Sequence, residues 1–305
     1  MAARPTPRRG HLLLATLTVA GLVAGVLAVR ALLPSSQPVC TATAAGRAVT
    51  LNPEQAANAA TIAGVAVGRG LPARAVTIAL AAALQESKLR NLDHGDLDSL
   101  GLFQQRPSQG WGSPAQVRDP VYAAGAFYDA LVKVPDYAAL PITEAAQRVQ
   151  RSAAGAAYAA HEADARVLAS ALTGWSAAGL TCQHLPGVRT AASGPDGPAG
   201  GGAPVGTAGQ IAQATAGLGE VFGARLLATK ATAGSNELTV TVRSGVSNSS
   251  QVGWAVASWL VANAGPLRIT AVGYDGRRWS RQDPSWPTVP GPTGPVAVVR
   301  LRIAG

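Results

Sequence analysis

The stretch AVTIALAAALQESKL, residues 75–89, decides how this chain is interpreted. It stays apolar almost without a break as far as Leu84 and becomes polar at Gln85 and Glu86. Pro72 stands just before it, and proline is tolerated in the first turn of a helix but not in its interior. The stretch therefore predicts a largely buried helix that ends at a carboxylate.

Glu86 has small neighbours on its own face of this helix. The positions three, four and seven residues earlier share that face, and all three are alanines: Ala83, Ala82 and Ala79. A carboxylate over small apolar side chains leaves room for a ligand and is poorly solvated, which suits a general acid. The alternative is a solvated glutamate at the helix end that pairs with Arg90, four residues later.

Helical patterns surround this stretch. Asn52-Pro53-Glu54-Gln55 combines an N-cap residue, a proline in the first turn and a glutamine at the third helical position, so a helix is expected to begin there. Three further helices are expected, over residues 119–133, 142–153 and 155–173. Residues 91–112 are polar and rich in turn-forming residues, and a long irregular segment inside a helical domain is often functional.

Three short motifs in this region occur in the order and spacing of a known superfamily. Glu86-Ser87 is followed fifteen residues later by Gly101-Leu102-Phe103-Gln104, and then by segment 119–128 with its glycine and aromatic residues. This arrangement resembles the lytic transglycosylases and goose-type lysozymes, in which a glutamate ends a helix and a Gly-Leu-Met/Phe-Gln segment lines the sugar-binding cleft. The resemblance covers about residues 51–175 and implies a mainly helical, lysozyme-like domain over residues 40–182.

The resemblance also implies roles for individual residues. Glu86 would be the general acid and base, and Ser87 would support it by hydrogen bonding. The residues expected in the substrate cleft are Ser87, Gln104, Gln105, Trp111 and Tyr158. Tyr158 stands in Ala157-Tyr158-Ala159, which lacks the asparagine of the family's Ala-Tyr-Asn segment. Trp111 is expected either to stack on a sugar ring or to plug the core beneath its loop.

Cleavage of a glycan usually needs two carboxylates. Asp93, Asp96 and Asp98 on the adjoining loop are candidates for the second, or they order the loop or are solvated. The resemblance implies that none of them is needed, because the N-acetyl group of the substrate can assist. Glu86 would protonate the glycosidic oxygen and then deprotonate the muramyl 6-hydroxyl to close an anhydro ring. The order of a calcium-binding loop is missing, so we expect no metal and no cofactor, and we expect His94 at the loop surface.

A second part of the chain follows a stretch of small residues. Residues 183–206 are dominated by glycine, proline and alanine, which predicts a flexible linker. Residues 207–305 are expected to form a small α+β domain in which a helix packs on a mostly antiparallel sheet, so the whole chain falls in the α+β class. Strands are expected over 227–229, 238–242, 267–272 and 296–301, and a helix over 249–264.

The first residues predict a single membrane anchor. Residues 12–33 are apolar except for Arg30 and are long enough to cross a hydrocarbon core about 30 Å thick. Residues 1–11 form a basic tail, which favours the cytoplasmic side. The alternative is a cleaved signal peptide. The bulk of the chain is therefore expected outside the cytoplasmic membrane, where Cys40 and Cys182 form a disulfide unless both thiols stay unpaired.

Composition and charge narrow the classes of function. The chain is 48% hydrophobic and 13% charged, which excludes a disordered protein. Its net charge of +9 is uneven, because residues 40–182 hold eleven basic and eleven acidic residues while residues 183–305 hold ten and five. Nucleic acid is not expected in this compartment. Anionic wall polymers, lipid headgroups or a protein are the expected partners of the last part.

One segment of that last part is rich in aromatic residues and arginines, which suits sugars, phosphates or a protein partner. Its residues are Tyr274, Arg277, Arg278, Trp279, Arg281 and Trp286. The alternative is that the two tryptophans cap the sheet and the arginines are solvated.

The sequence thus predicts a membrane-anchored, extracytoplasmic glycosidase that acts on peptidoglycan glycan strands, as a lytic transglycosylase or a muramidase. One alternative is a non-catalytic cell-wall-binding or assembly-scaffold protein on the same fold. The other is an interaction module whose partner docks on residues 207–305.

Overall fold

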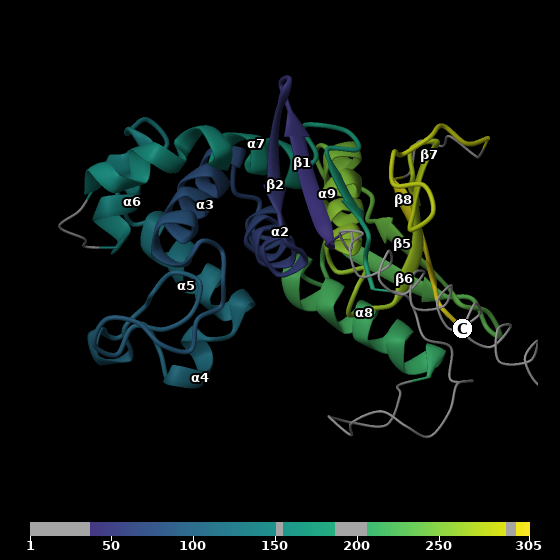
Figure 1. Cartoon of the computed structure of the whole chain (residues 1–305), viewed down its shortest axis with the longest axis horizontal. Helices are drawn as coiled ribbons and strands as arrows, with labels where there is room; N and C mark the ends of the chain where they lie inside the picture. The colour runs from purple at the N-terminus through teal and green to yellow at the C-terminus, as the bar shows by residue number, and fades with distance from the viewer. Residues whose placement is uncertain (1–36, 151–154, 187–205, 291–296) are drawn as a thin grey trace, which may run out of the picture. The chain divides into compact units, whose positions relative to one another are not determined.

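The structure is a computed structural model that describes residues 37–150, 155–186, 206–290 and 297–305 (Figure 1). These residues form an α+β fold with two antiparallel sheets, which confirms the predicted class. Within these ranges no helix combines the length and the apolar character that a membrane span needs. The predicted tail and anchor, residues 1–33, lie outside the described residues, and so does most of the predicted linker.

Helix α2 (Pro53–Gly68) begins where the sequence predicts. The side chain of Asn52 accepts a hydrogen bond from the backbone N–H of Gln55 at 2.9 Å, and the side chain of Gln55 accepts one from that of Asn52 at 3.0 Å. The predicted capping box is therefore confirmed. Helix α3 (Ala73–Ser87) follows and packs on α2, with every residue from Ala75 to Leu84 buried.

In chain order, the next elements of this part are η1 (Pro107–Gln109), α4 (Pro114–Val117), α5 (Pro120–Leu131), α6 (Ile142–Gln150), η2 (Gly155–His161) and α7 (Glu162–Leu172). The helices expected over 119–133 and 142–153 are present as α5 and α6, although residues 151–153 lie outside the described residues, and η1 and α4 were not expected. The expected helix over 155–173 is instead a 3₁₀ segment followed by an α-helix. Side chains three residues apart eclipse one another in a 3₁₀ segment, so Tyr158 and His161 leave it on one side.

A three-stranded sheet frames the helical part, and the sequence analysis did not anticipate it. Strand β1 (Val39–Ala44) lies between β2 (Arg47–Leu51) and β3 (Leu180–Gln183), antiparallel to both. Ala45 and Gly46 join β1 to β2 with φ of 48° and 72°, the two positive values that a tight type I′ hairpin requires. The strands are short and rich in alanine and threonine. Their alternation of buried and exposed residues is therefore a weak indication of a strand, compared with the long helical patterns nearby.

The last part contains the predicted helix on an antiparallel sheet. Its five strands lie in the order β4-β5-β8-β6-β7, and α9 (Ser249–Ala262) packs against β5, β6 and β8. Two elements were not anticipated, α8 (Thr207–Phe222) and the edge strand β7 (Arg277–Ser280). The other strands are β4 (Leu227–Ala231), β5 (Glu237–Val242), β6 (Ile269–Tyr274) and β8 (Val298–Ile303).

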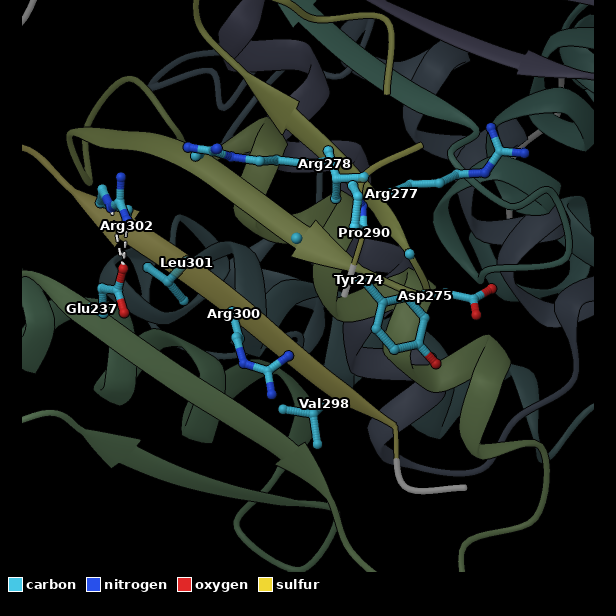
Figure 2. Close-up of a pocket in the computed structure, with 14 residues that line it drawn as sticks. Glu237, Tyr274, Asp275, Arg277, Arg278, Pro290, Val298, Arg300, Leu301 and Arg302 are labelled. Carbon is cyan, nitrogen blue, oxygen red and sulfur yellow. Dashed lines mark hydrogen bonds and ion pairs between the residues drawn. The ribbon is translucent and has the colours of Figure 1, made fainter. Parts of the chain in front are cut away.

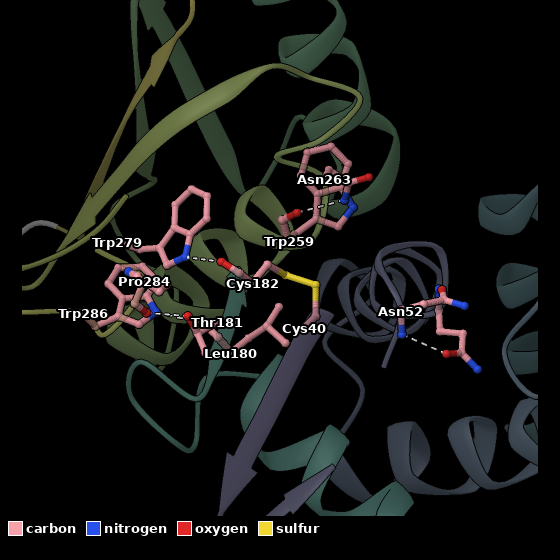
Figure 3. The surroundings of a disulfide bond; sticks show 11 residues. Cys40, Asn52, Leu180, Thr181, Cys182, Trp259, Asn263, Trp279, Pro284 and Trp286 are labelled. Atoms are coloured by element: carbon pink, nitrogen blue, oxygen red, sulfur yellow. Dashed lines mark hydrogen bonds between the residues drawn. A yellow bond between two sulfur atoms is a disulfide. The ribbon is translucent and has the colours of Figure 1, made fainter. Parts of the chain in front are cut away.

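The predicted disulfide is present and fully buried. Cys40 on β1 and Cys182 on β3 are direct cross-strand partners, and both are 0% exposed (Figure 3). The indole N–H of Trp279 donates to the carbonyl of Cys182 at 3.2 Å, and that of Trp286 donates to the carbonyl of Leu180 at 2.8 Å. The two tryptophans are therefore not exposed to a ligand, because they join β3 to the last part of the chain.

Helix α9 also joins the last part to the helical part. The indole N–H of Trp259 donates to Thr61 of α2 at 3.4 Å, and the hydroxyl of Ser258 donates to the carbonyl of Ala171 in α7 at 3.3 Å. The described residues between Pro38 and Gly305 form one compact unit with a shared hydrophobic core. The domain division predicted at residues 183–206 stays a prediction, and the two sides of it share this core.

Removing the cross-link is expected to destabilise the whole unit. The two cysteines are 142 residues apart, and a bond that closes such a loop stabilises the folded chain by roughly 5 kcal/mol on the chain-entropy model. We expect Cys40→Ala/Cys182→Ala to lower the free energy of unfolding in denaturant titrations by an amount of this order.

The matched control is Thr41→Ala, which changes the neighbouring position of β1 and keeps the cross-link. An unchanged free energy of unfolding in the double alanine variant would contradict the role given to the disulfide.

Candidate active site

Glu86 lies at the penultimate position of α3 and is half-buried. The three alanines on its face, Ala79, Ala82 and Ala83, are each 0% exposed because neighbouring helices cover them. The expectation that they leave an open space beneath the carboxylate is therefore wrong. Their small side chains instead allow close packing around α3, and the helix is partly exposed only at its two ends, at Ala73 and Arg74 and at Gln85 and Glu86.

The hydroxyl of Tyr158 donates a hydrogen bond to Oε1 of Glu86 at 2.7 Å. Tyr158 comes from η2, 72 residues later in the chain, and is 1% exposed. The structure thus brings together two of the predicted site residues. It places Tyr158 behind the carboxylate, as a group that holds Glu86, rather than on a surface that a sugar could reach.

The chain leaves α3 through an unusual turn directly after Glu86-Ser87. Lys88 and Leu89 both have left-handed backbones, with φ of 55° and 60°, which is costly for residues other than glycine. Two side chains of α2 satisfy the carbonyls of this turn. Gln55 donates to Lys88 O at 2.9 Å, and Asn58, which is buried, donates to Leu89 O at 2.8 Å. The sequence analysis missed this support because it joins segments more than thirty residues apart.

Ser87 connects α3 to the Gly-Leu-Phe-Gln segment. Its hydroxyl lies 2.8 Å from the carbonyl oxygen of Leu102 and 3.1 Å from that of Ala83, and the residue is 5% exposed. These partners are backbone carbonyls, so the expected hydrogen bond to Glu86 is not the one that Ser87 makes. Ser87 therefore fixes the segment against the end of the helix that carries Glu86.

The segment itself is folded against the core on one side and half-exposed on the other. Leu102 and Phe103 are 0% exposed, and Phe103 stacks on Phe127 with ring centroids 4.7 Å apart. Gln104 has φ of 47° and donates its amide to Gly101 O at 3.2 Å. Its partial exposure is consistent with the predicted place in a cleft, which stays a prediction.

Gln105 and Trp111 occupy different surroundings. Gln105 is 2% exposed, and its amide N–H donates to Ala123 O at 3.1 Å while its Oε1 has no partner among the described residues. It has almost no surface to offer a sugar. Trp111 is half-buried and packs against the core, so it acts at least in part as the plug under its loop.

Asp98 and Asp93 of the loop make different contacts. Asp98 accepts hydrogen bonds from Arg106 Nε at 2.8 Å and from the backbone N–H of Ser108 at 2.8 Å. The bond from Arg106, followed by that from Ser108, lowers the pKa of Asp98 to about 2. Asp98 is therefore a carboxylate that orders the loop. Asp93 pairs with exposed His94 at 2.9 Å.

His161 is a residue of this site that the sequence analysis missed. It lies three residues after Tyr158 on η2, and its Nε2 is 3.1 Å from Gln85 Oε1 and 3.2 Å from Lys88 Nζ. η2 thus contacts both sides of Glu86, through Tyr158 at the carboxylate and His161 at the flanking residues. The sequence does contain a signal for this contact, the Tyr-x-x-His spacing. In a 3₁₀ turn, side chains three residues apart lie on the same side, so Tyr158 and His161 can both face the end of α3.

Among the described residues no three histidine, cysteine or carboxylate side chains are grouped so that they could hold a metal ion. Neither a known protein family model nor a curated protein matches this chain. The lysozyme-like resemblance therefore stays a prediction.

The surroundings of His161 predict a pH dependence of stability. Burial lowers the pKa of His161, and the ammonium of Lys88 lowers it further against an opposing effect of Asp164. The unfolded chain then binds more protons than the folded one below the ordinary histidine pKa of about 6.5. This contribution to stability is full above that pH and is lost as the pH falls below it.

We expect wild type to lose more thermal stability than His161→Gln between about pH 7.5 and about pH 5. The control is His184→Gln, which removes an exposed histidine after β3 and should follow wild type. Parallel curves for wild type and His161→Gln would contradict the burial of a neutral histidine at this position.

Proposed function

We propose that this chain is a membrane-anchored, extracytoplasmic protein that cleaves the glycan strands of peptidoglycan, with Glu86 as its general acid and base. The observation that carries the proposal is the hydrogen bond of 2.7 Å from Tyr158 to Glu86 at the end of α3. It holds one oxygen of a half-buried carboxylate, and we assign the other oxygen, Oε2, to the substrate. The Gly-Leu-Phe-Gln segment, which Ser87 ties to the same helix end, supplies the adjoining surface.

The chemistry follows from this arrangement. Since the hydroxyl of Tyr158 donates to Oε1, the proton of the acid form belongs on Oε2 of Glu86. That proton passes to the glycosidic oxygen as the bond to the sugar breaks. The carboxylate left behind then removes the proton of the muramyl 6-hydroxyl, whose oxygen closes the anhydro ring, or that of a water molecule in simple hydrolysis. Glu86 ends in the protonation state in which it began.

The contacts of Asp98 favour a mechanism with one carboxylate. Asp98 is occupied by Arg106 and Ser108, so its oxygens are not free to attack a sugar carbon. The N-acetyl group of the substrate can stabilise the developing positive charge in place of a second carboxylate. This leaves Glu86 as the single residue to which we assign proton transfer.

The test is the release of soluble muropeptides from purified peptidoglycan by the full chain in a non-ionic detergent, analysed by mass spectrometry. General acid–base catalysis contributes about 10²–10⁴-fold, so we expect Glu86→Gln to reduce product by at least about 100-fold. Tyr158→Phe keeps the ring and removes the donor, so we expect a smaller fall in kcat with KM unchanged.

The control variant is Glu144→Gln, which removes an exposed carboxylate that pairs with Arg148 on α6. It is expected to retain wild-type activity. Equal product from wild type and Glu86→Gln would overturn the proposal. Binding of wild type to peptidoglycan without any product would also overturn it, in favour of a non-catalytic wall-binding protein.

A further inference from the structure

The outer face of the five-stranded sheet carries a groove that the site at Glu86 does not use. Helix α9 packs against one face of this sheet, and the groove lies over strands β5, β6, β7 and β8, with a volume of about 420 Å³ (Figure 2). This volume lies within the range typical of ligand pockets. Four arginines line it, Arg277, Arg278, Arg300 and Arg302.

The strand register explains how the arginines come together. Gly273 of β6 pairs with Arg278 of β7 on one side and with Arg300 of β8 on the other. Strands in a sheet are spaced by about 4.8 Å, so the backbones of the two arginines lie about 10 Å apart across the glycine. Arg302 follows Arg300 by two residues and faces the same way. Across the sheet, Arg278 and Arg300 therefore stand on the two sides of a gap at Gly273, and Arg302 lies beside Arg300 along β8.

The gap exists because Gly273 has no side chain. A methyl group at this position would meet only the carbonyl oxygens of Arg277 and Arg300, at 3.8 and 3.9 Å. The backbone of Gly273 does not have a positive φ, so its conformation does not require glycine. A glycine inside a strand weakens the strand and often marks a place where a ligand approaches the backbone closely.

The positive charge of the groove is only partly balanced. Glu237 pairs with Arg302 at 2.7 Å, and Asp275 lies in the turn between β6 and β7. Four arginines and two acids give the lining a formal charge of +2. Arg277, Arg278 and Arg300 make no ion pair within the described part of the chain, and all three are exposed. Arg277 pairs with Tyr274, whose side chain lies on the α9 side of the sheet, so its guanidinium points away from Arg278 (Figure 2). The two unpaired guanidinium groups on the outer face, those of Arg278 and Arg300, favour an anionic occupant.

We propose that this groove binds a phosphodiester chain, with consecutive phosphates held by Arg278 and Arg300 on the two sides of Gly273. The planar guanidinium group donates two parallel hydrogen bonds to a phosphate, which suits arginine over lysine at such a site. The two arginines lie on opposite sides of the gap, so a ligand with more than one phosphate engages both. This inference does not depend on the chemistry assigned to Glu86.

A soluble or wall-bound chain fits the groove better than a membrane surface. Proteins that insert into a membrane surface present exposed apolar side chains to it. The exposed large hydrophobic residues of the described chain are Leu97, Tyr122, Val132 and Trp175, and none of them lines the groove. The face around Gly273 is charged and concave instead.

The experiment is titration calorimetry of the full chain in non-ionic detergent with a short glycerol-phosphate oligomer. Glycerophosphoglycerol, a soluble phospholipid headgroup with one phosphodiester, is titrated in parallel. We expect the oligomer to bind about ten-fold or more tightly than the single headgroup, because it engages both arginines. Polyglutamate of similar length tests whether phosphate rather than negative charge is recognised, and we expect it to bind more weakly.

Three variants test the geometry. Arg278→Gln and Arg300→Gln are each expected to weaken oligomer binding by about ten-fold or more, since each removes a charge-assisted contact. Gly273→Val fills the gap without changing charge and is compatible with a strand, so we expect a loss of binding with an unchanged melting temperature. Arg225→Gln removes an exposed arginine outside the groove and should bind like wild type.

Four outcomes would overturn the proposal. The first is absence of oligomer binding to wild type, and the second is equal binding by wild type and the groove variants. Equal affinity for oligomer and headgroup would assign the groove to a lipid headgroup. Equal affinity for polyglutamate would assign it to polyanions in general.

Discussion

The buried cross-link between β1 and β3 is the constraint on which the rest of the structure depends. Cys40 and Cys182 lie opposite each other at 0% exposure, so the first strand and the last strand of the helical part are held in one sheet. The loop that they close contains every helix from α2 to α7, and hence the whole of the candidate active site. The carbonyls of β3 in turn receive the indole N–H groups of Trp279 and Trp286, so the last part of the chain docks on the same strand.

Within that frame, the candidate site is positioned by contacts from three separate segments. Helix α2 satisfies the left-handed turn after α3, η2 holds the carboxylate of Glu86, and Ser87 joins the helix end to the Gly-Leu-Phe-Gln segment. A carboxylate held in this way keeps one orientation without a ligand, which is what an acid needs if it is to meet a leaving oxygen at a fixed place. The groove on the outer face of the second sheet is built on different strands, and we assign it binding rather than catalysis.

Much of this frame could be predicted from sequence, and the failures have physical reasons. The capping box of α2, the end of α3 at Glu86-Ser87 and the alternating strands β5 and β8 depend on local patterns, and local patterns are visible in a single sequence. The sheet β2-β1-β3 was missed because its strands are short and because β1 pairs with β3, which is more than a hundred residues later in the chain. The support of Glu86 by Tyr158 and the approach of His161 depend on a 3₁₀ turn that resembles a helix in sequence. The alanines beneath Glu86 were expected to leave room for a ligand because a helical pattern does not say which face a neighbouring helix covers.

The central claim is that one core, closed by the disulfide, supports both the site and the second sheet. Native-state hydrogen exchange of the full chain, followed by mass spectrometry across increasing denaturant, tests it most directly. We expect the amides of α3, α9 and β8 to exchange through one global opening, with the same free energy and the same dependence on denaturant. Exchange of α9 and β8 through a separate opening of lower energy, while α3 stays protected, would contradict it.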